Sequence, residues 1–380
     1  MVSIYKKLGN YIQIVDERNR DLQDLPLMGL SVKKIFFPTI ANLVGTDMST
    51  YKIVYKNQFT YIADTSRRGD KIAIALNENF DKMLVSQAYT PFEIIDKNEL
   101  LPEYLMMWFR RPEFDRYARF KSHGSAREIF GWDEMCDTEL PIPSIEKQRE
   151  IVKEYHIIQN RIALNNQLIF KLEETGQAIY NNIAKDNCSN EYILKDLCSF
   201  QEGYVNPSKE HAKYFDGNVK WLRANDVNGG FILNTSRKLT AEGFNSAGSS
   251  ALLFSPQTIV ITKSGTIGRL GILCDYMCGN RAVINIKPKE DYNLPLIFFF
   301  LKSKYDELVD MAVGSAQKNL YVPTLATMKI SLPDNKYLTR FYLVANSLLE
   351  SMKLKTKENQ KLEELKDLLL AKMTRVESNI

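Results

Sequence analysis

The sequence predicts an α+β protein built from two repeated globular domains and two long α-helices, which pair as an antiparallel coiled coil. Two observations carry this prediction. Much of the first half of the chain recurs in the second half, and each copy ends in a long segment with almost no proline or glycine. We therefore expect the order domain, helix, domain, helix, with a pseudo-twofold relation between the two halves.

The repeat is clearest toward the end of each copy. With a shift of 190 residues, Gly124-Ser125-Ala126 aligns with Gly314-Ser315-Ala316, and the sequence Lys-Leu-Glu-Glu at 171–174 aligns with the same sequence at 361–364. Apolar positions match apolar positions between these two points. Self-similarity of this kind is the signature of a duplicated structural unit.

A second block aligns farther upstream with a shift of 199. Here 58–75 matches 257–274, and each segment is typical of a strand, a glycine-containing turn and a second strand. We divide the chain into a first domain at 1–143, a first helix at 144–187, a second domain at 188–333 and a second helix at 334–380.

Each long segment carries a stripe of apolar residues at alternating steps of four and three, the pattern of a helix that packs against another helix. In the first segment this seam runs from Ile151 to Ile183, broken only at Asn165 and Gly176. In the second it runs from Phe341 to 373 and is weaker in the middle. Polar seam residues cost stability but can fix register. The alternative is that each helix packs on its own domain.

The helix starts are also marked. Pro143 and Pro333 each close an apolar segment, and Ser144 and Asp334 then stand at plausible N-cap positions. A helix of about forty residues is on the order of 60 Å long.

The composition fits a globular protein and excludes few functions. Hydrophobic residues make up 44% and charged residues 25% of the 380 residues, and the net charge is +4. This balance permits nucleic-acid binding but does not require it. The five cysteines show no disulfide spacing, and no long apolar run follows the first residues, so we expect a cytoplasmic protein. The apolar stretch at 294–301 is too short to cross a membrane, which leaves no membrane partner.

Two related domains on a rigid helical spacer suit a reader of DNA. Pseudo-twofold DNA-binding proteins place equivalent elements about one helical turn apart, ~34 Å, on one face of the duplex. Because the two copies differ in sequence, they would read different half-sites. The target would then be split and asymmetric, with an unread gap set by the helices.

The junction between the first domain and its helix resembles the specificity subunits of type I restriction-modification enzymes. The resemblance rests on the turn at Gly124, on Trp132-Asp133, on the segment Leu140-Pro-Ile-Pro143, and on Glu146 with Gln148 before Ile151. The second copy fits at 314–333 but departs after Pro333, where Asn-Lys-Tyr-Leu replaces the glutamate–glutamine pair.

The resemblance implies a non-catalytic subunit with two target-recognition domains that binds double-stranded DNA. It also implies as partners two methyltransferase subunits, which dock on the helices, and restriction subunits, which translocate and cleave DNA. We expect no cofactor in this chain: S-adenosylmethionine, ATP and Mg²⁺ would be held by the partner subunits.

The sequence offers little for catalysis. Asn206-Pro207-Ser208-Lys209 lacks the second proline and the aromatic residue of an adenine methyltransferase motif, and no G-x-x-x-x-G-K-[ST] phosphate loop occurs. Cys274, Cys278 and three histidines do not make a zinc site, which needs four well-spaced ligands.

The candidate DNA-binding residues fall into three sets, since Lys and Arg bind phosphates and polar loop residues read bases. The sets are the strand-to-strand turns, the flanks of the Gly-Ser turns, and the segment after the second hairpin. Their members are Arg67, Arg68 and Lys71 with Lys263, Thr266 and Arg269; Lys121, Arg127 and Lys318; and Arg281.

Three other functions stay open. The chain could be a coiled-coil scaffold whose globular ends bind proteins, and such a scaffold would lack salt-sensitive DNA binding. It could be a DNA-binding regulator that acts without methyltransferase partners. It could also be an enzyme whose site is not visible in the sequence.

Overall fold

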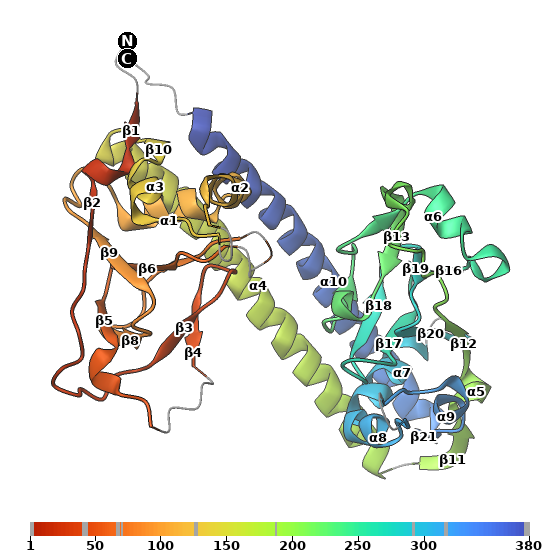
Figure 1. Ribbon diagram of the computed structural model, residues 1–380. Helices are drawn as coiled ribbons and strands as arrows, with labels where there is room; N and C mark the ends of the chain where they lie inside the picture. Colours follow the sequence, from red (N-terminus) through yellow and green to blue (C-terminus); the bar gives the residue numbers. More distant parts are fainter. Residues whose placement is uncertain are drawn as a thin grey trace. The chain divides into compact units, whose positions relative to one another are not determined.

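The computed structural model describes residues 4–39, 45–65, 69, 71–124, 128–186, 188–290, 293–314 and 318–375. The chain divides into two compact units (Figure 1). Unit 1 comprises 1–161 and 362–380, and unit 2 comprises 162–361. Each long helix therefore contributes one end to each unit.

Unit 1 contains a four-stranded antiparallel sheet in the order β2-β9-β6-β7, together with three strand pairs, β3-β4, β5-β8 and β1-β10. The strands are β1 (Tyr5–Lys7), β2 (Ile12–Ile14), β3 (Met28–Leu30), β4 (Phe36–Pro38), β5 (Lys52–Tyr55), β6 (Phe59–Ile62), β7 (Ala73–Leu76), β8 (Lys82–Val85), β9 (Thr90–Ile94) and β10 (Glu139–Pro141).

The helices of unit 1 complete its core. They are α1 (Pro102–Arg110), α2 (Pro112–Lys121) and α3 (Trp132–Cys136). Helix α1 packs on β7 and is buried over nearly its whole length. Phe59 and Phe92 of the sheet stack at 4.9 Å between ring centroids, and Phe109 of α1 meets Phe59 edge-on at 5.8 Å. Such aromatic packing adds to the stability gained from burial alone.

Unit 2 contains a five-stranded sheet in the order β12-β20-β17-β18-β14, a four-stranded sheet in the order β15-β13-β19-β16, and the pair β11-β21. The strands are β11 (Cys188–Ile193), β12 (Cys198–Glu202), β13 (Phe215–Leu222), β14 (Phe231–Ile232), β15 (Lys238–Leu239), β16 (Leu253–Phe254), β17 (Ile259–Thr262), β18 (Leu270–Leu273), β19 (Met277–Gly279), β20 (Val283–Pro288) and β21 (Lys329–Pro333).

Five short helices belong to unit 2: α5 (Leu194–Leu197), α6 (Ala241–Asn245), α7 (Leu294–Ser303), α8 (Tyr305–Asp310) and α9 (Val322–Ala326). Helix α7 packs on β18, as α1 packs on β7 in unit 1. The apolar stretch 294–301 is thus a buried helix start.

The repeat predicted from the sequence is present in the structure, with one correction. Helices α3 and α9 begin 190 residues apart, at 132 and 322, in agreement with the first alignment block. In the hairpins, the Phe130 amide donates to the Ala63 carbonyl oxygen, and the Leu320 amide donates to that of Lys263. The true shift on this strand is therefore 200, not 199.

The second hairpin strand differs more. Tyr61 pairs with Ile74 in the first hairpin, and Ile261 pairs with Leu270 in the second, so the shift there is 196. The second turn is four residues shorter (74 − 61 = 13 against 270 − 261 = 9). An ungapped alignment that spans both strands has a shift between these two values and pairs turn glycines that are not at equivalent positions.

The two long helices are α4 (Ile145–Asp186) and α10 (Asn335–Lys372). In unit 2 they run antiparallel, because Asn165 of α4 contacts Asn359 of α10, while Tyr180 lies 6.2 Å from Phe341 between ring centroids. In unit 1 the other two helix ends share one hydrophobic core through Ile151, Tyr155 and Leu370, with Met373 of the 3-10 turn after α10. The predicted fold class, two repeated α+β domains with two long paired helices, is confirmed.

Both breaks in the first seam have a physical cause. The Asn165 Nδ2 donates to Asn359 Oδ1 at 2.9 Å, and Asn359 Nδ2 donates to Asn166 Oδ1 at 2.8 Å. Gly176 makes room for the ring of Phe299 in α7, since a Cβ at this position would lie 2.2 Å from that ring. The seam therefore carries one polar pair between the helices and one point where a domain packs directly on the helix backbone.

The first helix is tied to its domain by Gln148, which is fully buried. Its Oε1 accepts from the Leu101 amide at 2.9 Å, and its Nε2 donates to the carbonyl oxygens of Glu99 at 2.8 Å and Pro143 at 2.9 Å. These bonds hold the chain just before α1. In unit 2 the equivalent position is an apolar leucine, and the Tyr342 hydroxyl, one turn later, donates to Asn293 Oδ1 at 2.8 Å before α7.

We expect Gln148→Ala to destabilise unit 1 by about 2–4 kcal/mol, because three backbone groups in a buried site lose their partner. Tyr342→Phe is the matched change in unit 2 and removes one bond, so we expect about 1 kcal/mol. Urea denaturation followed by circular dichroism measures both. A Gln148→Ala protein within about 0.5 kcal/mol of wild type, the usual range for an exposed site, would show that these bonds do not hold the helix.

Candidate nucleic-acid interface

In unit 1 the strand-to-strand turn and the Gly-Ser turn, predicted as separate sets, are joined by hydrogen bonds. The Thr65 amide donates to the Glu128 carbonyl oxygen at 3.1 Å, and the Thr65 hydroxyl lies 2.8 Å from that of Ser122. Ser122 in turn donates to the Ala118 carbonyl oxygen at 2.6 Å. His123 and Ile129 form a two-way backbone bridge across the Gly-Ser turn.

Three of the predicted residues of unit 1, Arg67, Arg68 and Arg127, lie outside the described residues. The other two are exposed: Lys71 follows the turn just before β7, and Lys121 is the last residue of α2. The bond from the Thr65 amide to the Glu128 carbonyl oxygen joins the described ends of the two turns.

Unit 2 repeats this arrangement with different side chains. Val313 and Asn319 form the bridge across the second Gly-Ser turn, and the next residue, Leu320, bonds to the Lys263 carbonyl oxygen. The Lys263 amide donates to the Ala282 carbonyl oxygen at 2.8 Å, which places Arg281 next to it in the fold. The structure therefore brings all three predicted sets of unit 2 together where β17 ends and β20 begins.

Lys263 is more enclosed than a simple phosphate contact would be. Its Nζ lies 2.9 Å from Glu202 Oε2 and 5.5 Å from the ring centroid of Tyr321, and its side chain is only 14% exposed. The Tyr204 hydroxyl donates to the same glutamate at 3.0 Å. This hydrogen bond raises the pKa of Tyr204. The charge of Lys263 is thus balanced within the protein.

The remaining predicted residues of unit 2 are Thr266, Arg269, Arg281 and Lys318, and all four side chains are exposed. The turn that carries the first two is fixed by Thr262, whose hydroxyl bonds to the Thr266 carbonyl oxygen and accepts from the Arg269 amide at 2.9 Å. Gly268, at φ +83°, allows the reversal of the chain.

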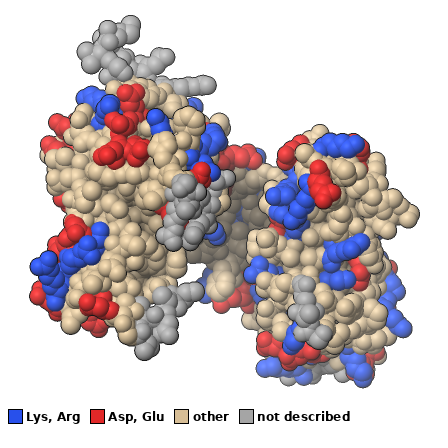
Figure 2. Space-filling model, viewed as in Figure 1, with Lys and Arg blue, Asp and Glu red and all other residues tan. Residues whose placement is uncertain are grey.

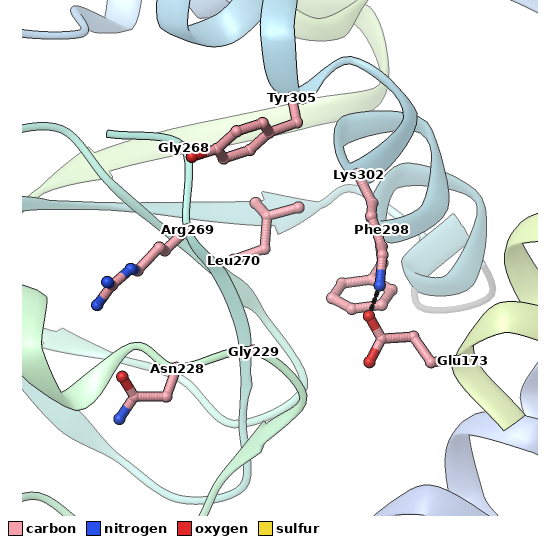
Figure 3. A pocket seen from close by; sticks show the side chains of 9 residues that line it. All are labelled: Glu173, Asn228, Gly229, Gly268, Arg269, Leu270, Phe298, Lys302 and Tyr305. Atoms are coloured by element: carbon pink, nitrogen blue, oxygen red, sulfur yellow. Dashed lines mark ion pairs between the residues drawn. The ribbon is translucent and has the colours of Figure 1, made fainter. Parts of the chain in front are cut away.

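Arg269 also lines a cavity of about 500 Å³ in unit 2. Figure 3 shows its guanidinium on the same side of the cavity as Asn228, with the Tyr305 ring beside Gly268. On the far side, Lys302 reaches toward Glu173 of α4 and forms an ion pair with it. This cavity combines one exposed cation with polar and aromatic side chains.

Sequence reasoning missed the aromatic and acidic members of this surface. Tyr204 and Tyr321 are 47% and 42% exposed, and they lie on either side of the Lys263–Glu202 pair through the contacts given above. Exposed tyrosines beside cations are typical of surfaces that contact nucleic acids. No spacing rule marks them, because they come from segments more than one hundred residues apart.

The surface charge is mixed rather than gathered. Figure 2 shows one face, on which Lys and Arg lie in several separate patches in each unit, many of them beside Asp or Glu. This pattern agrees with the small net charge of +4. Specific binding to an anion would therefore depend on local groups of cations.

The described residues hold no group of three or more His, Cys, Asp or Glu side chains that could share a metal ion. Within the same residues, no helix combines the length and the apolar character that crossing a bilayer requires. His123 is exposed, and its Nε2 lies 4.0 Å from Glu134.

Comparison with known proteins connects this fold to one family. The family described as "Type I restriction modification DNA specificity domain" matches residues 19–174 and again 189–364. The chain is 25% identical to the type I restriction enzyme HindI specificity subunit of Haemophilus influenzae, over 88% of this chain and 89% of that protein. Its fold is similar to the type I restriction-modification S subunit from M. genitalium, with a TM-score of 0.55 and 13% identity over 97% and 95% of the two chains.

We expect Lys263→Met to destabilise unit 2 by about 1–3 kcal/mol, because Glu202 would be left enclosed without its cation. Arg281→Ala, at an exposed neighbouring position, is the matched control and should stay within about 0.5 kcal/mol of wild type. Thermal unfolding of the three proteins tests this. Equal stability of all three would mean that the Lys263–Glu202 pair is not structural.

Proposed function

The chain belongs to the family of type I restriction-modification DNA specificity subunits, and we propose that it reads a bipartite, asymmetric DNA target for such a complex. In this proposal the chain itself is non-catalytic. Each domain recognises one half-site of double-stranded DNA.

The observation that carries this proposal is that one fold occurs twice with different side chains at equivalent positions. Where unit 2 has Lys263 and Tyr321, unit 1 has Ala63 and Gly131. In both units the carbonyl oxygen at the first of these positions accepts a bond from the residue just after the bridge across the Gly-Ser turn, Phe130 or Leu320. Base readout depends on individual side chains at groove-facing positions, so two such surfaces select two different sequences.

The long helices supply the spacing. Helix α4 has 42 residues and α10 has 38, which corresponds to a length on the order of 60 Å at 1.5 Å per residue. A paired helix bends little over this distance. We infer that the helices set the length of the unread gap between the half-sites.

The helices also carry side chains suited to partner proteins. In unit 2, Phe170, Leu343 and Leu354 are more than half exposed, and in unit 1 Ile157 and Leu368 are as well. Exposed apolar side chains that form a contiguous patch mark a protein interface. We propose that two methyltransferase subunits dock here, with restriction subunits bound to the complex.

In this complex, S-adenosylmethionine would be held by the methyltransferase subunits, and ATP and Mg²⁺ by the restriction subunits. The candidate contacts of this chain with DNA are then the exposed cations at the turns, Lys71, Lys121, Arg269, Arg281 and Lys318, together with Thr266 and, outside the described residues, Arg67, Arg68 and Arg127. Lys263 would act mainly by supporting this surface.

Methylation sequencing tests the function directly. The chain is expressed with its methyltransferase partner in a host that lacks DNA methylation, and the partner alone serves as control. We expect adenine methylation at one split, asymmetric motif only when both are present. Absence of this motif, with the partner shown to be competent on another specificity subunit, would favour a regulator or a scaffold instead.

A domain exchange tests whether each domain recognises one half-site. Replacing residues 1–143 with the first domain of a family member that reads another sequence should change one half-site of the methylated motif and leave the other half-site intact. This follows because each half-site is read by one domain. A change in both half-sites would contradict the modular reading.

A further inference from the structure

Unit 1 contains a cavity of about 590 Å³ between its globular domain and the ends of the two long helices. Its wall is built from four parts of the unit: the turn at 32–35, the end of the β6–β7 turn, the junction of α1 and α2, and one face each of α4 and α10. The lining is rich in cations, with Lys33, Lys34, Lys71, Arg110, Arg116 and Lys366.

One of these cations is already neutralised inside the wall. Lys34 is 5% exposed at its side chain, and its Nζ lies 2.9 Å from Asp115 Oδ1. It also donates to the Phe109 carbonyl oxygen and lies 5.7 Å from the ring centroid of Phe114. Lys34 and Asp115 together add no net charge, so Asp115 is not available to balance the other cations.

Lys33 and Lys71 are the most available cations. Both side chains are exposed, and among the described residues no carboxylate lies within ion-pair distance of either ammonium group. Burial lowers the pKa of Lys34, and the nearby charges of Lys71 and Arg110 lower it further, against the opposing effect of Asp115. Like charges are therefore held close together at this place.

The other three cations each pair with a glutamate that does not line the cavity. Arg110 lies 3.8 Å from Glu78, and its guanidinium stands 5.7 Å from the ring centroid of Tyr155. Arg116 pairs with Glu113, and Lys366 pairs with Glu363, and neither glutamate lines the cavity. Asp367 is the remaining acidic residue among the described lining residues. The cavity thus presents an excess of positive charge.

The corresponding cavity of unit 2 shows that the fold does not require this charge. It is built from comparable parts, the β17–β18 turn with Arg269, the junction of α7 and α8 with Lys302, a loop at 228–229 and α4 with Glu173, but α10 does not line it. In Figure 3, Lys302 is paired with Glu173, which leaves Arg269 as the one unbalanced cation among the described lining residues. The basic lining in unit 1 therefore needs a cause other than folding.

We propose that the cavity of unit 1 is a phosphate-binding site, with Lys33 and Lys71 as its principal ligands and Arg110 in support. A concave surface with low-dielectric walls concentrates the field of its cations and attracts anions. Lysine and arginine bind phosphate oxygens through charge-assisted hydrogen bonds. This inference rests on the proposed function insofar as the phosphate comes from the DNA backbone beside the first half-site.

The test compares Lys33→Ala/Lys71→Ala with Lys56→Ala/Lys97→Ala, which removes two exposed lysines of unit 1 that do not line the cavity. Binding of the full chain with its methyltransferase partner to a labelled 40-base-pair duplex of mixed sequence is measured by fluorescence anisotropy, at several KCl concentrations. Binding of inorganic pyrophosphate is measured by calorimetry.

For the cavity variant, we expect DNA affinity to fall about tenfold near 0.1 M salt, and the slope of log K against log salt to decrease by about 1 to 2. The control variant should keep the slope of the wild type. If instead only pyrophosphate binding is lost in the cavity variant, the site stands and its ligand is a free phosphate compound.

If both variants bind DNA and pyrophosphate equally, the phosphate site is refuted, while DNA binding by the wild type still supports the proposed function. If the wild type does not bind DNA at all, the proposed function is contradicted, and the pyrophosphate comparison alone decides the cavity.

Discussion

Both globular domains depend on the packing of α4 and α10. Each globular core includes one end of each long helix, so neither domain is complete without residues from both. The seam is mostly apolar and gains its stability from burial, but apolar contacts tolerate sliding. The hydrogen bonds of Asn359 with Asn165 and Asn166 do not, because a shift of one turn would leave the buried Asn165 amide without its partner. One polar contact therefore fixes the register of the two helices in unit 2.

Different side-chain contacts hold the long helices to the two domains. In unit 1, the buried amide of Gln148 holds three backbone groups, whereas in unit 2 the Tyr342 hydroxyl bonds to Asn293 and the ring of Phe299 lies against Gly176. This explains why the second copy can depart from the family pattern after Pro333 without losing the architecture. The departure moves the anchor by one turn and replaces an amide with a phenol. Both units keep a polar contact between the long helix and the residues just before a domain helix, α1 in unit 1 and α7 in unit 2.

The long helices could be predicted from the sequence because their signals are local: prolines and caps at the start, no helix breakers, and a seam at heptad spacing. The duplication was also visible, since the Gly-Ser turns and the helix starts keep a constant distance of 190 residues. The hairpins were misaligned because the second turn is four residues shorter, and a shift in strand register leaves no mark in composition.

The partners of individual cations were not predictable, because they come from distant segments. Lys263 was expected to face DNA, yet it is paired with Glu202, sixty-one residues away. No motif or repeat in the sequence marks Lys33 or Lys34 as a candidate binding residue. Only the fold shows that Lys34 is buried against Asp115, while Lys33 lines a cavity with Lys71 and Arg110. The proposal that the paired helices set the distance between the two half-sites likewise depends on contacts between residues far apart in the sequence.

Shortening both helices by one facing heptad tests this claim most directly. Deleting 158–164 from α4 and 360–366 from α10 keeps the contacts of Asn359 with Asn165 and Asn166 and the seam pattern, spares the residues of both hydrophobic cores, and removes ~10 Å of helix at 1.5 Å per residue. Methylation sequencing should then show both half-sites unchanged and the gap between them shorter by about three base pairs, since ten base pairs span ~34 Å. An unchanged gap, or altered half-site sequences, would contradict the role of the helices in setting this distance.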